Sequence, residues 1–276
     1  MKAVIDIGTN SVRFLRQVEG KLKEDVYYTR LGEDTHLDGM IKPQAYERTL
    51  TALKTALSEL NTDNILITAT SALREAKNRE GILARFYEDL GYEVTLLSGE
   101  DEARVNYLGA TQDFEGEALV LDIGGGSTEV STREKGKLNT LSLPIGALRL
   151  KDNPQHYTPL SAYLEPFLEF SKVDLPLIGT GGTITSLALI AQNLSAYDAA
   201  KIHGYLLSSE KLEALARAIQ KDSAILSPLP KKRQDILPQG LAILQAMMRI
   251  LEQTSLLVST KDGLYGLQND KLWVKN

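Results

Sequence analysis

Three short loops rich in glycine, serine and threonine follow apolar segments in this sequence of 276 residues. They are Gly8-Thr9-Asn10-Ser11, Gly124-Gly125-Gly126-Ser127-Thr128 and Gly179-Thr180-Gly181-Gly182-Thr183. Such a loop can turn several backbone N–H groups toward one point, because glycine permits positive φ and close approach, and it can therefore cradle a phosphate. One loop alone could be a tight connection and nothing more. Three loops of this type in one chain favour phosphate binding.

Two aspartates, Asp6 and Asp122, end the apolar segments before the first and second loops. Sheet geometry would aim both side chains into a crevice, where a buried carboxylate needs a partner. Hydrated Mg²⁺ meets that need, because it accepts one or two protein carboxylates beside substrate phosphate. An aspartate that accepts hydrogen bonds from loop N–H groups would look the same in sequence. The equivalent positions of the two residues favour metal or phosphate.

Other charged residues could complete such a site. One carboxylate of Glu100-Asp101-Glu102 could orient or deprotonate an attacking water, although acidic residues also stabilise the start of a helix. Glu129 is a second candidate carboxylate or a strand residue that faces solvent. Arg74 could clamp a phosphate or lie on the surface. The basic run Lys231-Lys232-Arg233 could guide a polyanion or be a solvated loop. We expect His203 to be a structural residue or to support the site from behind.

The composition narrows the class of protein. With 43% apolar and 24% charged residues the chain is typical of globular proteins, and its apolar runs are far shorter than the roughly 20 residues that cross a bilayer. No cysteine and only three histidines are present, so any metal would be held by carboxylates, water and phosphate. The net charge of −5 argues against general nucleic-acid binding, and Asp6 interrupts any signal-peptide core. We expect a soluble, cytoplasmic protein.

The elements that would position these residues can be predicted from periodicity. The related segments VIDIGTNS and VLDIGGGS indicate two similarly built α/β halves, and a polar turn at 114–116 predicts domains over 1–116 and 117–276. Each half starts with a strand, a loop and a hairpin, and the second half is the more helical. Besides these hairpins and a helix after Pro43, the expected elements are strands at 64–68, 93–97, 175–179 and 255–259, and helices at 79–90, 101–112, 160–170, 182–193, 209–221 and 239–253.

Taken in order, these motifs resemble the exopolyphosphatase and guanosine pentaphosphate phosphohydrolase family, within the actin, sugar-kinase and Hsp70 superfamily of folds. Further segments agree with it along nearly the whole chain: Thr70-Ser71-Ala72-Leu73-Arg74, Ser98-Gly99-Glu100-Asp101-Glu102-Ala103-Arg104, Leu143-Pro144-Ile145-Gly146-Ala147, Pro230-Lys231-Lys232-Arg233 and Asp262-Gly263-Leu264-Tyr265-Gly266. The resemblance implies two actin-like (ribonuclease H-like) domains, with mixed sheets flanked by helices and an active site in the cleft between them.

The resemblance also implies roles for single residues. Glu102 falls on the catalytic glutamate, and Asp122 and Glu129 match the other acidic site residues. Arg74 matches an arginine that contacts phosphate. We therefore expect Glu102 and Glu129 to be catalytic, Asp6, Asp122 and Glu129 to hold Mg²⁺, and the three loops with Arg74 to bind phosphate. The implied reaction is Mg²⁺-assisted in-line attack of water on a terminal phosphorus.

The expected function is that of an exopolyphosphatase, which removes terminal phosphate from inorganic polyphosphate. This sequence stops after two core domains, where longer members continue into C-terminal helical domains, so we expect a short form that favours short to medium chains. Hydrolysis of guanosine pentaphosphate is the alternative within the family. A sensor that binds polyphosphate or guanosine penta- or tetraphosphate without turnover is a third hypothesis. We expect no nucleic-acid or membrane partner, and a homodimer is a further hypothesis.

Overall fold

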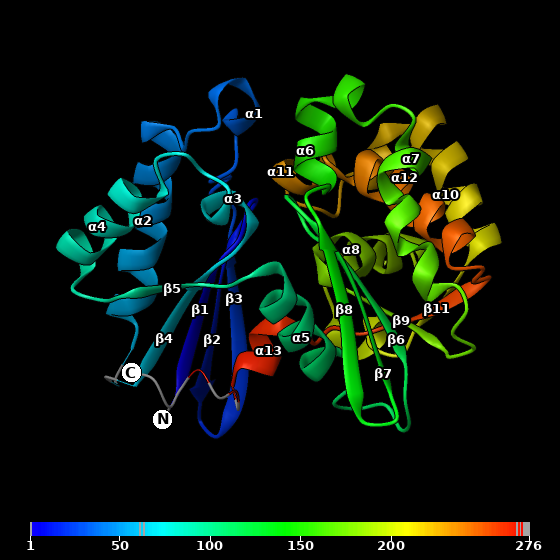
Figure 1. Cartoon of the computed structure of the whole chain (residues 1–276), viewed down its shortest axis with the longest axis horizontal. Helices are drawn as coiled ribbons and strands as arrows, with labels where there is room; N and C mark the ends of the chain where they lie inside the picture. The colour runs from blue at the N-terminus through cyan, green and yellow to red at the C-terminus, as the bar shows by residue number, and fades with distance from the viewer. Residues whose placement is uncertain (1, 61, 63, 269, 271, 273–276) are drawn as a thin grey trace.

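The computed structural model describes residues 2–60, 62, 64–268, 270 and 272, and it shows two α/β lobes, each built on a mixed sheet (Figure 1). The first sheet has the strand order β3-β2-β1-β4-β5, in which β1 and β2 form an antiparallel pair and β4 runs parallel to β1. Its strands are β1 (Ala3–Ile7), β2 (Val12–Val18), β3 (Lys21–Tyr27), β4 (Ile65–Ala69) and β5 (Val94–Leu96). The predicted fold class is confirmed.

The second sheet repeats the hairpin of the first. Its order is β10-β11-β9-β6-β7-β8, with strands β6 (Leu119–Ile123), β7 (Thr128–Glu134), β8 (Lys137–Leu143), β9 (Leu177–Thr180), β10 (Leu206–Ser208) and β11 (Ser255–Val258). In the first hairpin Asp6 pairs with Arg13, and in the second Asp122 pairs with Glu129. The repeated turn therefore places each aspartate opposite a second charged residue.

Helices cover both faces of the first sheet. They are α1 (Thr35–Asp38), α2 (Pro43–Ser58), α3 (Ser71–Arg74), α4 (Arg79–Leu90) and α5 (Gly99–Ala110). Pro43 starts α2 because its missing N–H would have no partner in the first turn, and Gly91 ends α4 in the left-handed conformation. In Figure 1, α2 and α4 lie on the outer side of the first lobe, whereas α5 lies between the two lobes.

The second lobe is the more helical one, as predicted. Its helices are α6 (Ala147–Asp152), α7 (Leu160–Leu164), α8 (Gly181–Ala191), α9 (Ala199–Ile202), α10 (Ser209–Lys221), α11 (Lys231–Gln234) and α12 (Leu237–Ile250), with 3-10 turns at Pro154–Tyr157, Glu165–Phe170 and Ser223–Leu226. The helix expected over 160–170 is wrong in its second half. Pro166 cannot donate a backbone hydrogen bond, so α7 ends and a 3-10 turn follows. Across the described residues, no helix has the length and apolarity needed to span a membrane.

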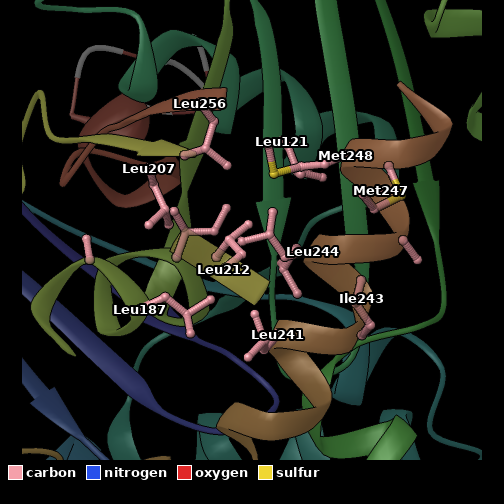
Figure 2. Close-up of a cluster of buried hydrophobic side chains, with 14 of the residues drawn as sticks. Leu121, Leu187, Leu207, Leu212, Leu241, Ile243, Leu244, Met247, Met248 and Leu256 are labelled. Carbon is pink, nitrogen blue, oxygen red and sulfur yellow. The ribbon is translucent and has the colours of Figure 1, made fainter. Parts of the chain in front are cut away.

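Each lobe has its own apolar core. In the second lobe Leu241 and Leu244 of α12 pack with Leu187 of α8 and Leu121 of β6 (Figure 2). A smaller cluster joins the first sheet to α5 and to α13 (Gly263–Leu267), the last helix in the described residues. The chain therefore returns to the first lobe after β11, and α5 and α13 lie side by side between the sheets (Figure 1). The division at residue 116 stays a prediction.

Candidate active site

A cleft of about 370 Å³ lies between the lobes and contains most of the predicted site residues. The predicted residues that line it are Asp6, Gly8, Thr9, Asn10, Ser11, Glu102, Asp122, Gly124, Gly125, Gly126, Ser127, Gly181 and Gly182. They come from the ends of β1, β6 and β9 and from the start of α5. The carboxyl ends of these strands meet at the cleft, which is where ligands bind in open α/β sheets.

The first two loops have the same turn and touch across the cleft. Gly8 N donates to Ser11 O at 2.9 Å, and Gly124 N donates to Ser127 O at 3.0 Å. A Cβ atom added at Gly126 would lie 2.3 Å from Thr9 Oγ1, so only glycine permits this approach. The backbone N–H groups of one loop from each lobe are thus brought to a common point.

Several polar atoms in this cleft are buried and have no hydrogen-bond partner in the described part of the chain. They are Thr9 Oγ1, both polar side-chain atoms of Asn10, and Asp122 Oδ1. Because the large majority of buried side-chain polar atoms are paired in native proteins, four such atoms at one place call for a ligand. The ligand must offer both hydrogen-bond acceptors and a group that binds a carboxylate oxygen. A phosphate accompanied by a cation has this chemistry.

The third loop places a helix start against Asp122. Gly181 has φ +83°, and a Cβ atom there would lie 2.0 Å from Asp122 Oδ1. It opens α8, whose first turn carries no acidic side chain of its own, so the positive end of the helix dipole at the cleft favours an anion. Thr183, by contrast, packs against Gly240 and does not line the cleft.

Glu102 enters the cleft from the first turn of α5, which Ser98 caps by accepting a hydrogen bond from Asp101 N. Arg74 Nη1 donates to Glu102 Oε2 at 2.8 Å and to Leu97 O at 3.1 Å. Burial raises the pKa of Glu102 to about 7, and the Arg74 guanidinium opposes this rise. A carboxylate that titrates near neutral pH is suited to accept a proton from water.

The other predicted carboxylates surround Glu102. Burial raises the pKa of Asp122 to about 7 and also raises the pKa of Asp6, and the nearby negative charges add to both effects. The pKa of Glu129 is raised well above its ordinary value, by burial first and then by Glu102 and Asp122. Four acidic groups in mutual repulsion are a local environment that attracts a cation.

The described residues contain no group of three or more acidic, cysteine or histidine side chains placed to bind a metal by themselves. This is compatible with Mg²⁺, which keeps several waters and uses one or two carboxylates together with substrate phosphate. The unpartnered Oδ1 of Asp122 is a suitable ligand atom, and Asp6 lies near enough to influence its charge. The residues present therefore fit a magnesium ion held jointly with a substrate.

Three further predicted residues lie behind the cleft lining. Ser142 Oγ donates to Glu129 Oε1 at 2.7 Å, which turns this carboxylate toward β8. Thr128 Oγ1 donates to Ile145 O at 2.6 Å and is fully buried. Arg74 contacts Glu102 rather than the cleft itself. These residues lie behind the lining, so the predicted contacts of Thr128 and Arg74 with phosphate and the predicted catalytic and metal-binding roles of Glu129 stay predictions.

Sequence reasoning missed a partly buried arginine, Arg13, and two of its carboxylate partners, Glu24 and Asp262. Arg13 lies 3.6 Å from Asp6 Oδ2 and 3.9 Å from Glu24 Oε1, and it also pairs with Asp262. All of them line the cleft. The hairpin register, which sets Arg13 opposite Asp6, is a signal that could have found the first contact. The contact with Asp262 joins distant parts of the chain and has no such signal.

The basic run at 231–233 is not a solvated loop throughout, and its role as a guide for a polyanion stays a prediction. It forms α11, and Arg233 is 9% exposed and lines the cleft beside Gly182. Among the ion pairs of the described residues none involves Arg233, so its charge is available to an anion. Burial lowers the pKa of Arg233, which nevertheless stays a cation. His203 lies outside the cleft, 3.5 Å from Asp113, in agreement with a structural role.

The two lobes bring paired glycine loops and a central glutamate together in a candidate phosphate site, and similarity to known proteins identifies the family. Residues 15–267 match the Ppx/GppA phosphatase family, and the chain belongs to this family. It is 31% identical to Exopolyphosphatase 2 of Mycobacterium tuberculosis over 96% of both proteins. It is 30% identical to a Guanosine-5'-triphosphate,3'-diphosphate pyrophosphatase of Pseudoalteromonas atlantica over 98% of this chain.

Length distinguishes these relatives from one another. The chain spans 60% of the Pseudoalteromonas protein and 46% of a bifunctional 3-dehydroquinate synthase/phosphatase of Fusobacterium nucleatum, to which it is 30% identical. The solved structure of the Aquifex aeolicus family member is 30% identical, with a TM-score of 0.76 over 99% of this chain and 98% of that one. An exopolyphosphatase of Cytophaga hutchinsonii shares the fold, with a TM-score of 0.85 over 99% and 97% of the two chains, at 22% identity.

Proposed function

We propose that this protein is an exopolyphosphatase that uses Mg²⁺ to hydrolyse the terminal phosphate of inorganic polyphosphate, with short to medium chains favoured. The observation that carries the proposal is the set of buried, unpartnered polar atoms of Thr9, Asn10 and Asp122, which faces Glu102 across one cleft. Exopolyphosphatase 2 of Mycobacterium tuberculosis, which this chain matches over 96% of both proteins, supports the same choice by its name. The limited volume of the cleft favours short substrates.

The proposed roles follow from position. Loop N–H groups, the start of α8 and Arg233 hold successive phosphates and offset their charge. Glu102 takes a proton from a water molecule while the oxygen of that water attacks the terminal phosphorus. The bond from this phosphorus to the bridging oxygen then breaks, and the shortened chain leaves. Arg74 keeps Glu102 in place. When bound by Asp122 and the substrate, Mg²⁺ would neutralise charge that develops on the phosphate oxygens.

Phosphate release from tripolyphosphate and longer polyphosphate tests this proposal, with Glu102→Gln as the variant. The substitution keeps the shape and removes the base, so we expect a loss of about 10²- to 10⁴-fold in kcat. Glu100→Gln is the matched control, because Glu100 lies in the same helical turn but is exposed and outside the cleft. Wild-type activity in Glu102→Gln would contradict the role of Glu102. Binding without release by the wild type would favour a sensor.

A nucleoside-bearing substrate is the second candidate, because part of the cleft lining is apolar and aromatic. Tyr28, Tyr197, Leu189 and Leu229 line it, and Tyr197 is 56% exposed, so its ring is open to a base. Guanosine pentaphosphate could place its base there and its phosphates on the loops. The ratio of kcat/KM for this nucleotide and for tripolyphosphate decides between the two. If the base stacks on this ring, Tyr197→Ser should lower kcat/KM for guanosine pentaphosphate and leave kcat/KM for tripolyphosphate unchanged.

Cytoplasmic action and a homodimer are part of the same proposal. A chain without cysteine gains nothing from an oxidising compartment, which supports the first. Fractionation of the source cells and sedimentation of the purified protein test the two statements separately. Activity in an extracellular fraction would contradict cytoplasmic action, and a monomer at all protein concentrations would contradict the homodimer.

A further inference from the structure

Asn106 connects three separate parts of the chain behind the cleft. It lies on α5, one turn after Glu102, and it is 4% exposed. Its Nδ2 donates to Asp122 Oδ2 at 2.7 Å, and its Oδ1 accepts a hydrogen bond from Gly263 N at 2.7 Å. One amide therefore ties α5 to the end of β6 and to the start of α13.

The orientation of this amide is fixed by chemistry. A backbone N–H can only donate, so the atom that faces Gly263 must be the oxygen of Asn106. The NH₂ group is then forced to face Asp122, whose carboxylate can only accept when it is ionised. Asn106 is therefore the donor in its hydrogen bond with Asp122.

The support for Asn106 is unusually close. A Cβ atom at Gly263 would lie 2.5 Å from Asn106 Oδ1, and one at Gly266 would lie 2.0 Å from Val105 O. These glycines let α13 approach the backbone of α5, and interiors packed in this way do not deform continuously. Asn106 therefore has little freedom to move with Asp122.

The consequence concerns the two oxygens of Asp122. Oδ2 accepts the hydrogen bond from Asn106, whereas Oδ1 is buried, faces Gly181 and has no hydrogen-bond partner among the residues that the structure describes. We propose that Asn106 is a positioning residue that holds Asp122 by Oδ2 and so presents Oδ1 to the phosphate site. This inference rests on the proposed function, and it assigns a residue that does not itself touch the substrate.

Two substitutions of Asn106 test it. Asn106→Ala removes both hydrogen bonds, while Asn106→Asp keeps an oxygen for Gly263 N and turns a second carboxylate toward Asp122. Residues that orient a ligand from behind typically contribute about 10- to 100-fold, so we expect kcat for tripolyphosphate to fall by that factor in both variants. The fall in kcat should be at least as large for Asn106→Asp as for Asn106→Ala, because the new carboxylate repels Asp122. A purely structural role through Gly263 predicts the reverse order.

Asn78 provides the matched control. Its amide also bridges two groups, donating to Ile41 O and accepting from Ile41 N, both at 3.0 Å, and it lies away from the cleft. Asn78→Ala should lower the unfolding midpoint as Asn106→Ala does, and leave kcat and KM unchanged. Wild-type kcat in a folded Asn106 variant, or an equal loss in Asn78→Ala, would overturn the inference.

A binding measurement separates this inference from the proposed function. Mg²⁺ and tripolyphosphate together should raise the thermal unfolding midpoint of the wild type and of Asn78→Ala, and raise that of Asn106→Ala by clearly less. If the wild type is stabilised but hydrolyses nothing, the proposed function fails while the role of Asn106 is still measured. An equal rise in all three proteins would refute that role.

Discussion

Gly181→Ala combines a backbone cost with a direct collision at Asp122, and the two parts can be separated. Gly181 and Gly91 have similar backbone angles, φ +83° and φ +74°. An added Cβ would meet nothing within 4 Å at Gly91, but it would lie 2.0 Å from Asp122 Oδ1 at Gly181. Alanine in the left-handed region costs about 1–2 kcal/mol at either position. Gly91→Ala therefore measures the backbone part alone.

The collision at Gly181 requires Asp122 to move by more than an ångström, because a normal contact needs about 3.4 Å. Overpacking of this kind adds about 1–3 kcal/mol, so the total loss of unfolding free energy is expected to be about 2–5 kcal/mol. A displacement of about 1 Å at a reacting centre can lower the rate about 10²-fold. Urea unfolding and phosphate release from tripolyphosphate measure the two effects. Wild-type kcat in Gly181→Ala, or an equal loss of kcat in Gly91→Ala, would refute the reasoning.

Two further predictions concern charge. The pKa of Glu102 is about 7, and the Arg74 guanidinium lowers it. Arg74→Met should therefore raise the pKa of Glu102 and move the acid limb of the pH profile of kcat/KM to higher pH. An acid limb at the wild-type pH would contradict the pairing of Arg74 with Glu102. Arg30 and Asp235 form an ion pair between the lobes, and this pair holds α11 and therefore Arg233 in place. Asp235→Asn should raise KM about two- to fivefold, which is the range expected for the loss of a partly exposed ion pair. Unchanged KM at low salt would show that α11 needs no such support.

The parts of the site that could be predicted are those coded within one segment. A buried strand, a glycine loop and an aspartate follow one another directly, so the positions of Asp6 and Asp122 follow from the local pattern. Glu102 lies in the first turn of a helix that begins at a serine cap, which is also a local signal. The hairpins and the long helices α4 and α10 were predictable for the same reason.

The parts that could not be predicted depend on contacts between distant segments. Asp262 reaches Arg13 because α13 packs on the first sheet, and Arg233 lines the cleft because α11 lies beside the start of α8. The short helix α13 has five residues and no periodicity of its own, and it is held by packing on α5. Glu129 accepts a hydrogen bond from Ser142 on the next strand and does not line the cleft, which the loop sequence alone does not indicate.

Hydrolysis of tripolyphosphate in water enriched in heavy oxygen, with both products analysed by mass spectrometry, tests the central claim most directly. Attack of water on a terminal phosphorus predicts one heavy oxygen in the released phosphate and none in the pyrophosphate. Label in the pyrophosphate would mean that the central phosphorus is attacked and the terminal phosphate leaves, and the proposed attack on the terminal phosphorus would be wrong. Tight binding of tripolyphosphate with no release of phosphate would contradict catalysis altogether and leave a sensor.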